Sequence, residues 1–161
     1  MELQWFVAHT RPRCEKKLVE YCQRVALATT LPCYTAIHKY RSKTVRFSKP
    51  LFPGYVFLHL AEGQPQKAYQ SDYVANLLKV FDQALFAQQL GEIQRALETD
   101  LEVRLAPEIG QGSKVKIKSG PLRGMEGWVE QRYGITTVLL RLDFIGQAAA
   151  VKLEARELEL I

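Results

Sequence analysis

The spacing of apolar residues predicts alternating strands and helices in the first part of the chain. Residues 3–8 form a short apolar run with aromatic and β-branched members, which is typical of a buried strand. Thr10 and Pro12 then indicate a helix start, and apolar residues at helical spacing predict an amphipathic helix over residues 12–28. The elements expected after it are a basic hairpin over residues 33–49, strands over 55–60 and 74–80, and helices over 64–72 and 86–98. This order favours an α+β fold with helices packed on a mainly antiparallel sheet.

The strand expected over residues 55–60 is apolar on both faces. Alternation places its aliphatic residues on one face and its aromatic residues on the other. A domain of this size has few helices, so we expect them to cover only one face. The face with Tyr55, Phe57 and His59 is then expected to meet solvent or a partner.

The pattern changes in the second part of the chain. From Thr99 to Gly112 the periodicity lapses, and turn residues then separate short strands that predict a small closed barrel. The strands are expected over residues 114–118, 127–131, 136–142 and 148–153. The domains are accordingly expected at 1–100 and 110–161, with a linker at 101–109.

Composition restricts the class of protein. The chain has 161 residues, of which 47% are hydrophobic, so it can form one ordinary or two small folded domains. No apolar run reaches the roughly 18–20 residues of a membrane-spanning helix, and the N-terminal residues lack the pattern of a signal peptide. The odd number of cysteines fits neither a zinc site nor a disulfide framework. We therefore expect a cytoplasmic monomer without a metal or other cofactor and without a membrane partner.

The net charge of +5 is concentrated in one segment. Residues 9–49 contain ten Lys and Arg residues against Glu15 and Glu20, a balance of +8. Clustered positive charge is typical of a protein that binds a polyanion, although it can also simply solvate a helix face and a hairpin. The candidate patch for nucleic acid lies at the start and on the outer face of the first helix. It comprises Arg11, Arg13, Lys17 and Arg24, with Tyr21 available for base stacking.

The residues that could carry catalysis are scattered. His9, His38 and His59 have no metal-ligand spacing, and the cysteines lack a partner that would activate a nucleophile. No glycine-rich loop that could hold a phosphate is present. The sequence therefore indicates that the protein is not an enzyme.

Motifs in both halves of the chain resemble one family. Residues 112–129 read Gly-Ser-Lys-Val-Lys-Ile-Lys-Ser-Gly-Pro-Leu-Arg-Gly-Met-Glu-Gly-Trp-Val, which closely resembles the KOW motif. Residues 4–7 (Gln-Trp-Phe-Val), a basic helix and residues 51–57 (Leu-Phe-Pro-Gly-Tyr-Val-Phe) precede it, and this order is similar to that of the NusG family. Residues 144–153 resemble the last two barrel strands of that family. The resemblance implies an antiparallel NGN domain packed with helices, followed by a small SH3-like KOW β-barrel.

The resemblance also implies a function. NusG-like proteins act in transcription elongation and antitermination: the first domain binds RNA polymerase, and the second recruits another factor. The Leu51–Phe57 motif and the basic first helix look more like specialised paralogues such as RfaH, LoaP and UpxY. The alternatives are a housekeeping NusG acting in elongation and Rho-dependent termination, or a KOW-type protein that binds RNA or the ribosome.

Three sets of site residues follow from the resemblance. The first set, the polymerase set, is expected to dock on the clamp helices of the largest polymerase subunit; the alternative is that its residues are buried in the core. The second set is the basic patch defined above, which is expected to contact the non-template DNA strand of the transcription bubble. The KOW set would bind Rho or a small-subunit ribosomal protein. The polymerase set is Phe52, Tyr55, Phe57, His9, Ile93 and Leu97, and the KOW set is Phe144, Ile145 and Gly146.

The C-terminal tail carries conflicting signals. Residues 148–161 are rich in Ala, Leu and Glu, which favour helix, although they lie in the barrel pattern. The related protein RfaH refolds this domain from a helical hairpin to a barrel. Gly120 and Pro121 turn the chain, and Gly124 and Gly127 permit tight backbone geometry. Because these residues favour the barrel, we expect a barrel here.

Overall fold

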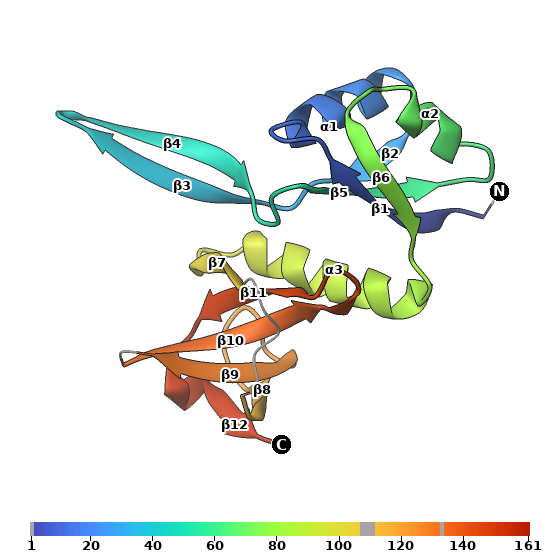
Figure 1. Ribbon diagram of the computed structural model, residues 1–161. Helices are drawn as coiled ribbons and strands as arrows, with labels where there is room; N and C mark the ends of the chain where they lie inside the picture. Colours follow the sequence, from blue (N-terminus) through green and yellow to red (C-terminus); the bar gives the residue numbers. More distant parts are fainter. Residues whose placement is uncertain (1, 107–111, 133) are drawn as a thin grey trace. The chain divides into compact units, whose positions relative to one another are not determined.

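The computed structural model describes residues 2–106, 112–132 and 134–161, and these residues form an α+β protein (Figure 1). Two compact units divide the chain. The first combines Met1–Cys33 with Phe52–Ala87, and the second combines Tyr34–Leu51 with Gln88–Ile161. No helix in the described residues is both long and apolar enough to cross a membrane.

An antiparallel sheet of four strands forms the centre of the first unit, in the order β2-β5-β1-β6. The two central strands pair so that Tyr55 lies opposite His9 and His59 lies opposite Trp5. The register therefore brings the aromatic residues of one strand beside those of the other. The strands are β1 (Gln4–Thr10), β2 (Ala28–Thr30), β5 (Tyr55–Leu60) and β6 (Val74–Lys79).

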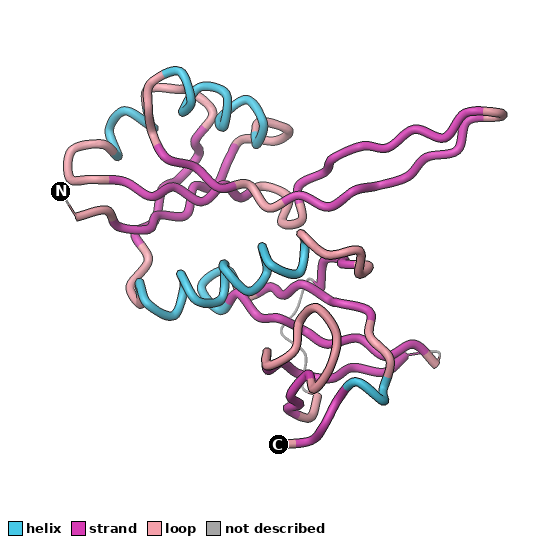
Figure 2. Tube along the Cα trace, turned by 180° about the vertical axis from the view of Figure 1, so that it is seen from behind, coloured by secondary structure: helices cyan, strands magenta, loops and turns pink. Residues whose placement is uncertain are grey.

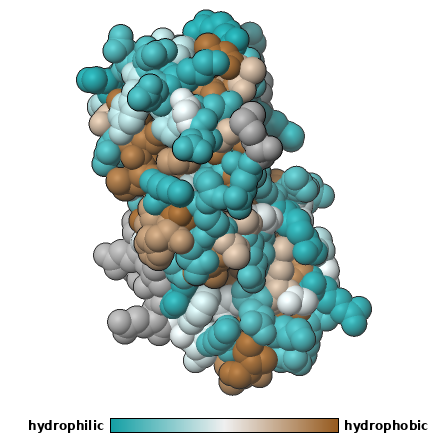
Figure 3. Space-filling view, turned by 90° about the vertical axis from the view of Figure 1, so that its right-hand side faces the viewer, coloured by the Kyte–Doolittle hydropathy of each residue, from teal (hydrophilic) through white to brown (hydrophobic). Residues whose placement is uncertain are grey.

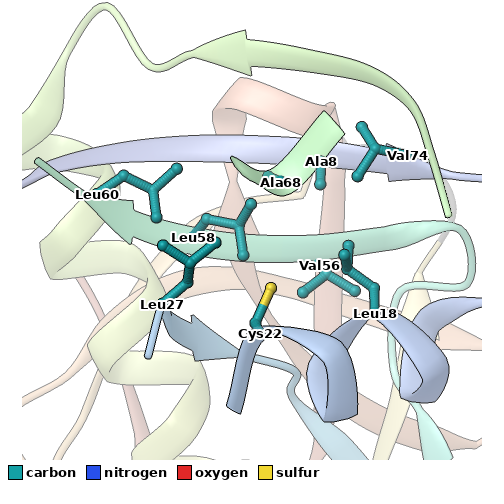
Figure 4. Close-up of a cluster of buried hydrophobic side chains, with 9 residues drawn as sticks. All are labelled: Ala8, Leu18, Cys22, Leu27, Val56, Leu58, Leu60, Ala68 and Val74. Atoms are coloured by element: carbon teal, nitrogen blue, oxygen red, sulfur yellow. The ribbon is translucent and has the colours of Figure 1, made fainter. Parts of the chain in front are cut away.

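One face of this sheet packs against helices α1 (Glu15–Arg24) and α2 (Pro65–Tyr69). Figure 4 shows Leu18 and Cys22 of α1 lying close to aliphatic side chains of β5. These two residues are four apart and therefore share one face of the helix. The buried cluster comprises Ala8, Leu18, Cys22, Leu27, Val56, Leu58, Leu60, Ala68 and Val74.

The other face of the sheet is also partly covered, which corrects our expectation that it is open. Phe57 is fully buried because Phe86, near the start of α3 (Gln83–Leu97), packs edge-on against it with ring centroids 5.4 Å apart. Phe52 packs against the same ring at 6.2 Å. Burying such rings is favourable through the area they remove from water and through edge-to-face geometry. Tyr55 and His59, on the same face of β5, are only half-buried.

The hairpin predicted over residues 33–49 is confirmed. Strands β3 (Cys33–Tyr40) and β4 (Lys43–Pro50) pair as a two-stranded sheet, and Figure 2 shows them running side by side. A two-residue turn, Arg41 and Ser42, joins them.

A six-stranded antiparallel sheet forms most of the second unit, in the order β12-β8-β9-β10-β11-β7. Its strands are β7 (Val103–Ala106), β8 (Lys114–Ile117), β9 (Glu126–Arg132), β10 (Ile135–Leu142), β11 (Gln147–Lys152) and β12 (Leu158–Leu160). Two 3₁₀ turns, η1 (Asp143–Ile145) and η2 (Ala155–Glu157), separate the last strands. The tail thus forms β11, η2 and β12 rather than the helix that its composition favours.

Several element boundaries differ from the prediction. The first helix was expected over residues 12–28 but covers only Glu15–Arg24, because Ala26 adopts a left-handed conformation (φ 59°) and the chain continues into β2. Strand β7 lies within residues 101–109, where we expected a linker, because its pairing with β11 outweighs its weak local pattern. Residues 107–109 of that linker lie outside the described residues. The third helix begins earlier than expected, at Gln83 rather than residue 86.

Candidate functional site

Two stacked aromatic pairs lie on the face of the first sheet opposite α1. The rings of His9 and Tyr55 stack with centroids 5.2 Å apart, and those of Trp5 and His59 stack at 4.3 Å. Both pairs are direct cross-strand neighbours of β1 and β5, a position in which side-chain contacts stabilise a sheet. His9 is exposed and the other three residues are half-buried. We call these four residues the aromatic patch, in which two pairs of stacked rings are partly accessible to solvent.

Backbone contacts hold the turn before Tyr55 in place. Gly54 adopts φ +88°, a conformation that suits glycine, and its N–H donates to a carboxylate oxygen of Glu15 at 3.0 Å. Its carbonyl oxygen accepts a hydrogen bond from the N–H of Thr10 at 2.8 Å. The turn is therefore tied both to the first turn of α1 and to the end of β1, which fixes Tyr55 beside His9.

The predicted polymerase residues fall into different environments. Phe52 and Phe57 are 1% and 0% exposed, and both belong to the aromatic packing of the first unit. Ile93 is fully buried and Leu97 is half-buried, and both lie in the part of α3 that belongs to the second unit. Only His9 and Tyr55 of this set form one surface within a single unit, and the contact of any of them with polymerase stays a prediction.

Exposed apolar side chains near the aromatic patch were missed by the sequence analysis. Leu78 of β6 is 48% exposed and lies opposite Val7, so it shares the face of β1 that carries Trp5 and His9. Phe81, which follows β6, is 88% exposed. Figure 3 shows that apolar patches lie among hydrophilic residues in the view that it gives. Alternation could not identify Leu78, because the register shift at His9 and Thr10 places Leu77, rather than Leu78, on the core face that Val74 occupies.

The predicted basic patch lies in the loop before α1 and along that helix. Its four cations, Arg11, Arg13, Lys17 and Arg24, are all exposed. The N–H of Arg11 donates to the carbonyl of Tyr73 at 2.9 Å, which anchors the loop.

Tyr21 is positioned differently from the cations of the basic patch. Residues 17, 21 and 24 lie on one stripe of α1 because they are spaced by four and three residues. The ring of Tyr21 is half-buried against the core cluster, and its hydroxyl donates to the carbonyl of Lys67 at 2.7 Å. Its ring is therefore less available for base stacking than the sequence suggested.

The predicted KOW residues lie in and directly after η1. Phe144 and Ile145 are half-buried, and Gly146 ends the turn in a left-handed conformation (φ 67°). Gln89 holds the start of the turn: its Oε1 accepts from the N–H of Asp143, and its Nε2 donates to the Asp143 carboxylate, each at 3.0 Å. These residues thus form one short loop anchored by a side chain of α3.

The described residues offer little for chemistry. Burial raises the pKa of the Cys22 thiol to about 11, so this cysteine is protonated at neutral pH. No group of three His, Cys, Asp or Glu residues in the described part of the chain could hold a metal ion. The first unit thus carries an aromatic patch on one face of its sheet, and exposed cations before and along α1, which packs on the other face. Accessible surfaces of these two kinds are typical of a class of protein that binds macromolecules.

The comparison with protein families agrees with this class and narrows it. The family model described as transcription termination factor nusG matches residues 3–89, more than half of the chain, and the chain belongs to the NusG family. The matched region contains the aromatic patch and the basic patch. No curated protein matches the chain. Members of the NusG family are transcription factors that bind RNA polymerase and act during elongation.

Proposed function

We propose that this protein is an elongation and antitermination factor that binds RNA polymerase through residues 1–100 and recruits a second factor through residues 110–161. The family match over residues 3–89 is the observation that carries this proposal. It covers the strands that present the aromatic patch, and these strands supply the proposed contact with polymerase.

His9 and Tyr55 are the proposed anchors on the clamp helices of the largest polymerase subunit. They are the accessible members of the predicted set in the first unit, and their stacked rings are already ordered before binding. Rigid aromatic anchors lose little conformational entropy on association. Phe52 and Phe57 are buried in the core, so truncating either one is expected to reduce the stability of the fold.

The basic patch extends the proposed contact to the non-template DNA strand. Arg11 and Arg13 follow His9 closely in the chain, so the polymerase anchor and the first cations lie on adjoining segments. Binding that favours the closed, elongating form of polymerase over the paused form would suppress pausing without any chemistry by the factor itself.

The second domain is proposed to be a KOW barrel that binds Rho or a small-subunit ribosomal protein through Phe144, Ile145 and Gly146. The antiparallel pairing of strands β8 to β12 and the motif at residues 112–129 support this assignment. The Leu51–Phe57 motif supports a specialised paralogue of the RfaH, LoaP or UpxY kind. The description of the matching family model as a termination factor favours a housekeeping NusG as the second candidate.

Transcription through a terminator in vitro distinguishes the two candidates. An antitermination factor increases readthrough, and this effect is lost in the variant His9→Ala/Tyr55→Ala but retained in Tyr55→Phe, which keeps the ring. Increased termination that requires Rho would favour the housekeeping candidate. Equal transcripts with and without the protein, at intrinsic and Rho-dependent terminators alike, would contradict the proposal.

A further inference from the structure

The β3–β4 hairpin carries a concentrated, unneutralised positive charge outside the patch on α1. Residues 33–50 contain five Lys and Arg residues and no Asp or Glu. All five cations are exposed. Within the described residues, no carboxylate forms an ion pair with the four cations nearest the turn: Lys39, Arg41, Lys43 and Arg46. The hairpin therefore offers its charge to a partner.

Exposed rings lie among these cations. The ring of His38 stacks on Tyr40 with centroids 6.1 Å apart and meets Phe47 edge-on at 5.3 Å. The ammonium of Lys49 lies 3.3 Å from Nε2 of His38. These contacts place four side chains on one face of the hairpin, which we call the ring face. Tyr40 is 56% and Phe47 39% exposed, although neither ring is needed to cover a core on this two-stranded sheet.

Arg41, in the turn of the hairpin, has a left-handed backbone conformation that does not favour a residue with a long side chain. Arg41 has φ 47°, in the left-handed region that two-residue hairpin turns usually fill with Gly, Asn or Asp. A strained residue on a surface turn points to a use for its side chain. Here the side chain adds a guanidinium to the end of the hairpin.

We propose that the hairpin at residues 33–50 is a binding site for single-stranded nucleic acid. Bases stack on Tyr40 and Phe47, and the cations of the hairpin neutralise the adjoining phosphates. An acidic protein surface would neutralise the cations but would not stack on the rings. A single strand does both, because each nucleotide carries a phosphate and a flat base. This site uses none of the residues of the basic patch or the aromatic patch and requires no polymerase.

Fluorescence anisotropy of a labelled 15-nucleotide oligo-dT with the full chain tests the stacking. The variant Tyr40→Ala/Phe47→Ala is expected to bind about fivefold or more weakly. Tyr40→Leu/Phe47→Leu is expected to lose a similar factor, because it keeps apolar area but removes the aromatic faces. Ile37→Ala is the matched control: Ile37 is 57% exposed, and as the neighbour of His38 in β3 it lies on the opposite face. It is expected to bind like the wild type.

The dependence of binding on salt tests the cations. Arg41→Ala/Lys43→Ala/Lys49→Ala, which removes the guanidinium of the turn and two ammonium groups that alternation places on the ring face, is expected to reduce the slope of log K against log salt by about 2, at roughly 0.7 for each lost phosphate contact. Lys116→Ala/Arg123→Ala/Lys152→Ala removes the same charge from exposed residues of the second unit outside the hairpin and is expected to leave the slope unchanged. Arg41→Gly relieves the backbone strain, so it is expected to weaken binding without lowering the thermal unfolding temperature.

Three results would overturn the proposal. The first is that the ring variants bind like the wild type while circular dichroism shows them folded. The second is that both triple variants lose the same slope, which would reduce the effect to net charge. The third is that a duplex of the same sequence binds more tightly than the single strand.

Discussion

Cys22 illustrates how packing sets the chemistry of one residue. Its side chain is fully buried between α1 and β5, and no charged group compensates for the burial, so the pKa of the thiol rises to about 11. The folded chain keeps this proton when the unfolded chain loses it. As pH rises from about 9 toward 11, the contribution of Cys22 to the free energy of unfolding therefore falls.

We expect Cys22 to react with a thiol reagent at pH 8 far more slowly than Cys14 and Cys33, which are only half-buried. At that pH roughly one Cys22 in a thousand is ionised, and access is blocked as well. Mass-resolved alkylation kinetics measure the three rates separately. In denaturant the three rates should converge; equal rates in the folded protein would contradict the packing described.

Gly127 is a position at which the structure leaves no room for a side chain. A Cβ there would lie 2.5 Å from Cγ1 of Val138 and 2.9 Å from the carbonyl oxygen of Leu139, so β9 approaches β10 too closely for any side chain. The sequence motif predicts tight backbone geometry at this glycine, and the structure shows the reason, which is the close packing of two strands.

Gly127→Ala is accordingly expected to lower the free energy of unfolding by about 1–3 kcal/mol. Gly91→Ala is its matched control, because Gly91 is exposed within α3 and a Cβ there meets nothing within 4 Å. This control should stabilise the chain by about 0.5–1 kcal/mol. Urea titrations of both variants give the two values, and a stable Gly127→Ala variant would contradict the strand packing.

At the scale of elements, local patterns predicted most of the strands and helices but not all their ends. The hairpin was found from alternation and breakers, both of which are local signals. The end of α1 at Arg24 and the strands β2 and β7 depended on pairing with β5 and β11, which are distant in sequence. Such pairing is not visible in a window of a few residues.

The same limit applies to the candidate site. Alternation along residues 55–60 correctly separated the two faces of β5, which identified Tyr55 as a surface residue. It could not show that Phe86, from a helix that follows much later in the chain, covers Phe57. The side chains that α3 contributes to the first unit were therefore the missing information.

Gln83 joins α3 to β1 and offers a test of this packing. Its amide nitrogen donates to the carbonyls of Trp5 and Val80 at 3.0 and 2.7 Å, and its amide oxygen accepts from the N–H of Trp5. Gln83→Ala is expected to cost about 1–3 kcal/mol of stability, because it leaves part-buried backbone groups unpaired. Gln94→Ala, at an exposed position of the same helix, should change stability little. Equal effects in thermal unfolding would contradict this role of Gln83.

At the scale of the whole molecule, the positive charge of residues 9–49 divides between two elements. One part lies before and along α1, next in sequence to the aromatic patch, and the other lies on the β3–β4 hairpin with its own exposed rings. The net charge of +5 gave no sign of this division. We propose nucleic acid as the partner of both parts: the non-template DNA strand at the basic patch and a single strand at the hairpin.

Direct binding of core RNA polymerase to the full chain tests the central claim most directly. With polymerase immobilised, the wild type and Tyr55→Phe are expected to bind, and a fragment carrying the clamp helices is expected to compete. His9→Ala/Tyr55→Ala should weaken binding by about tenfold or more while its circular dichroism stays unchanged. Undiminished binding of that folded double variant, or failure of the clamp-helix fragment to compete, would contradict the account.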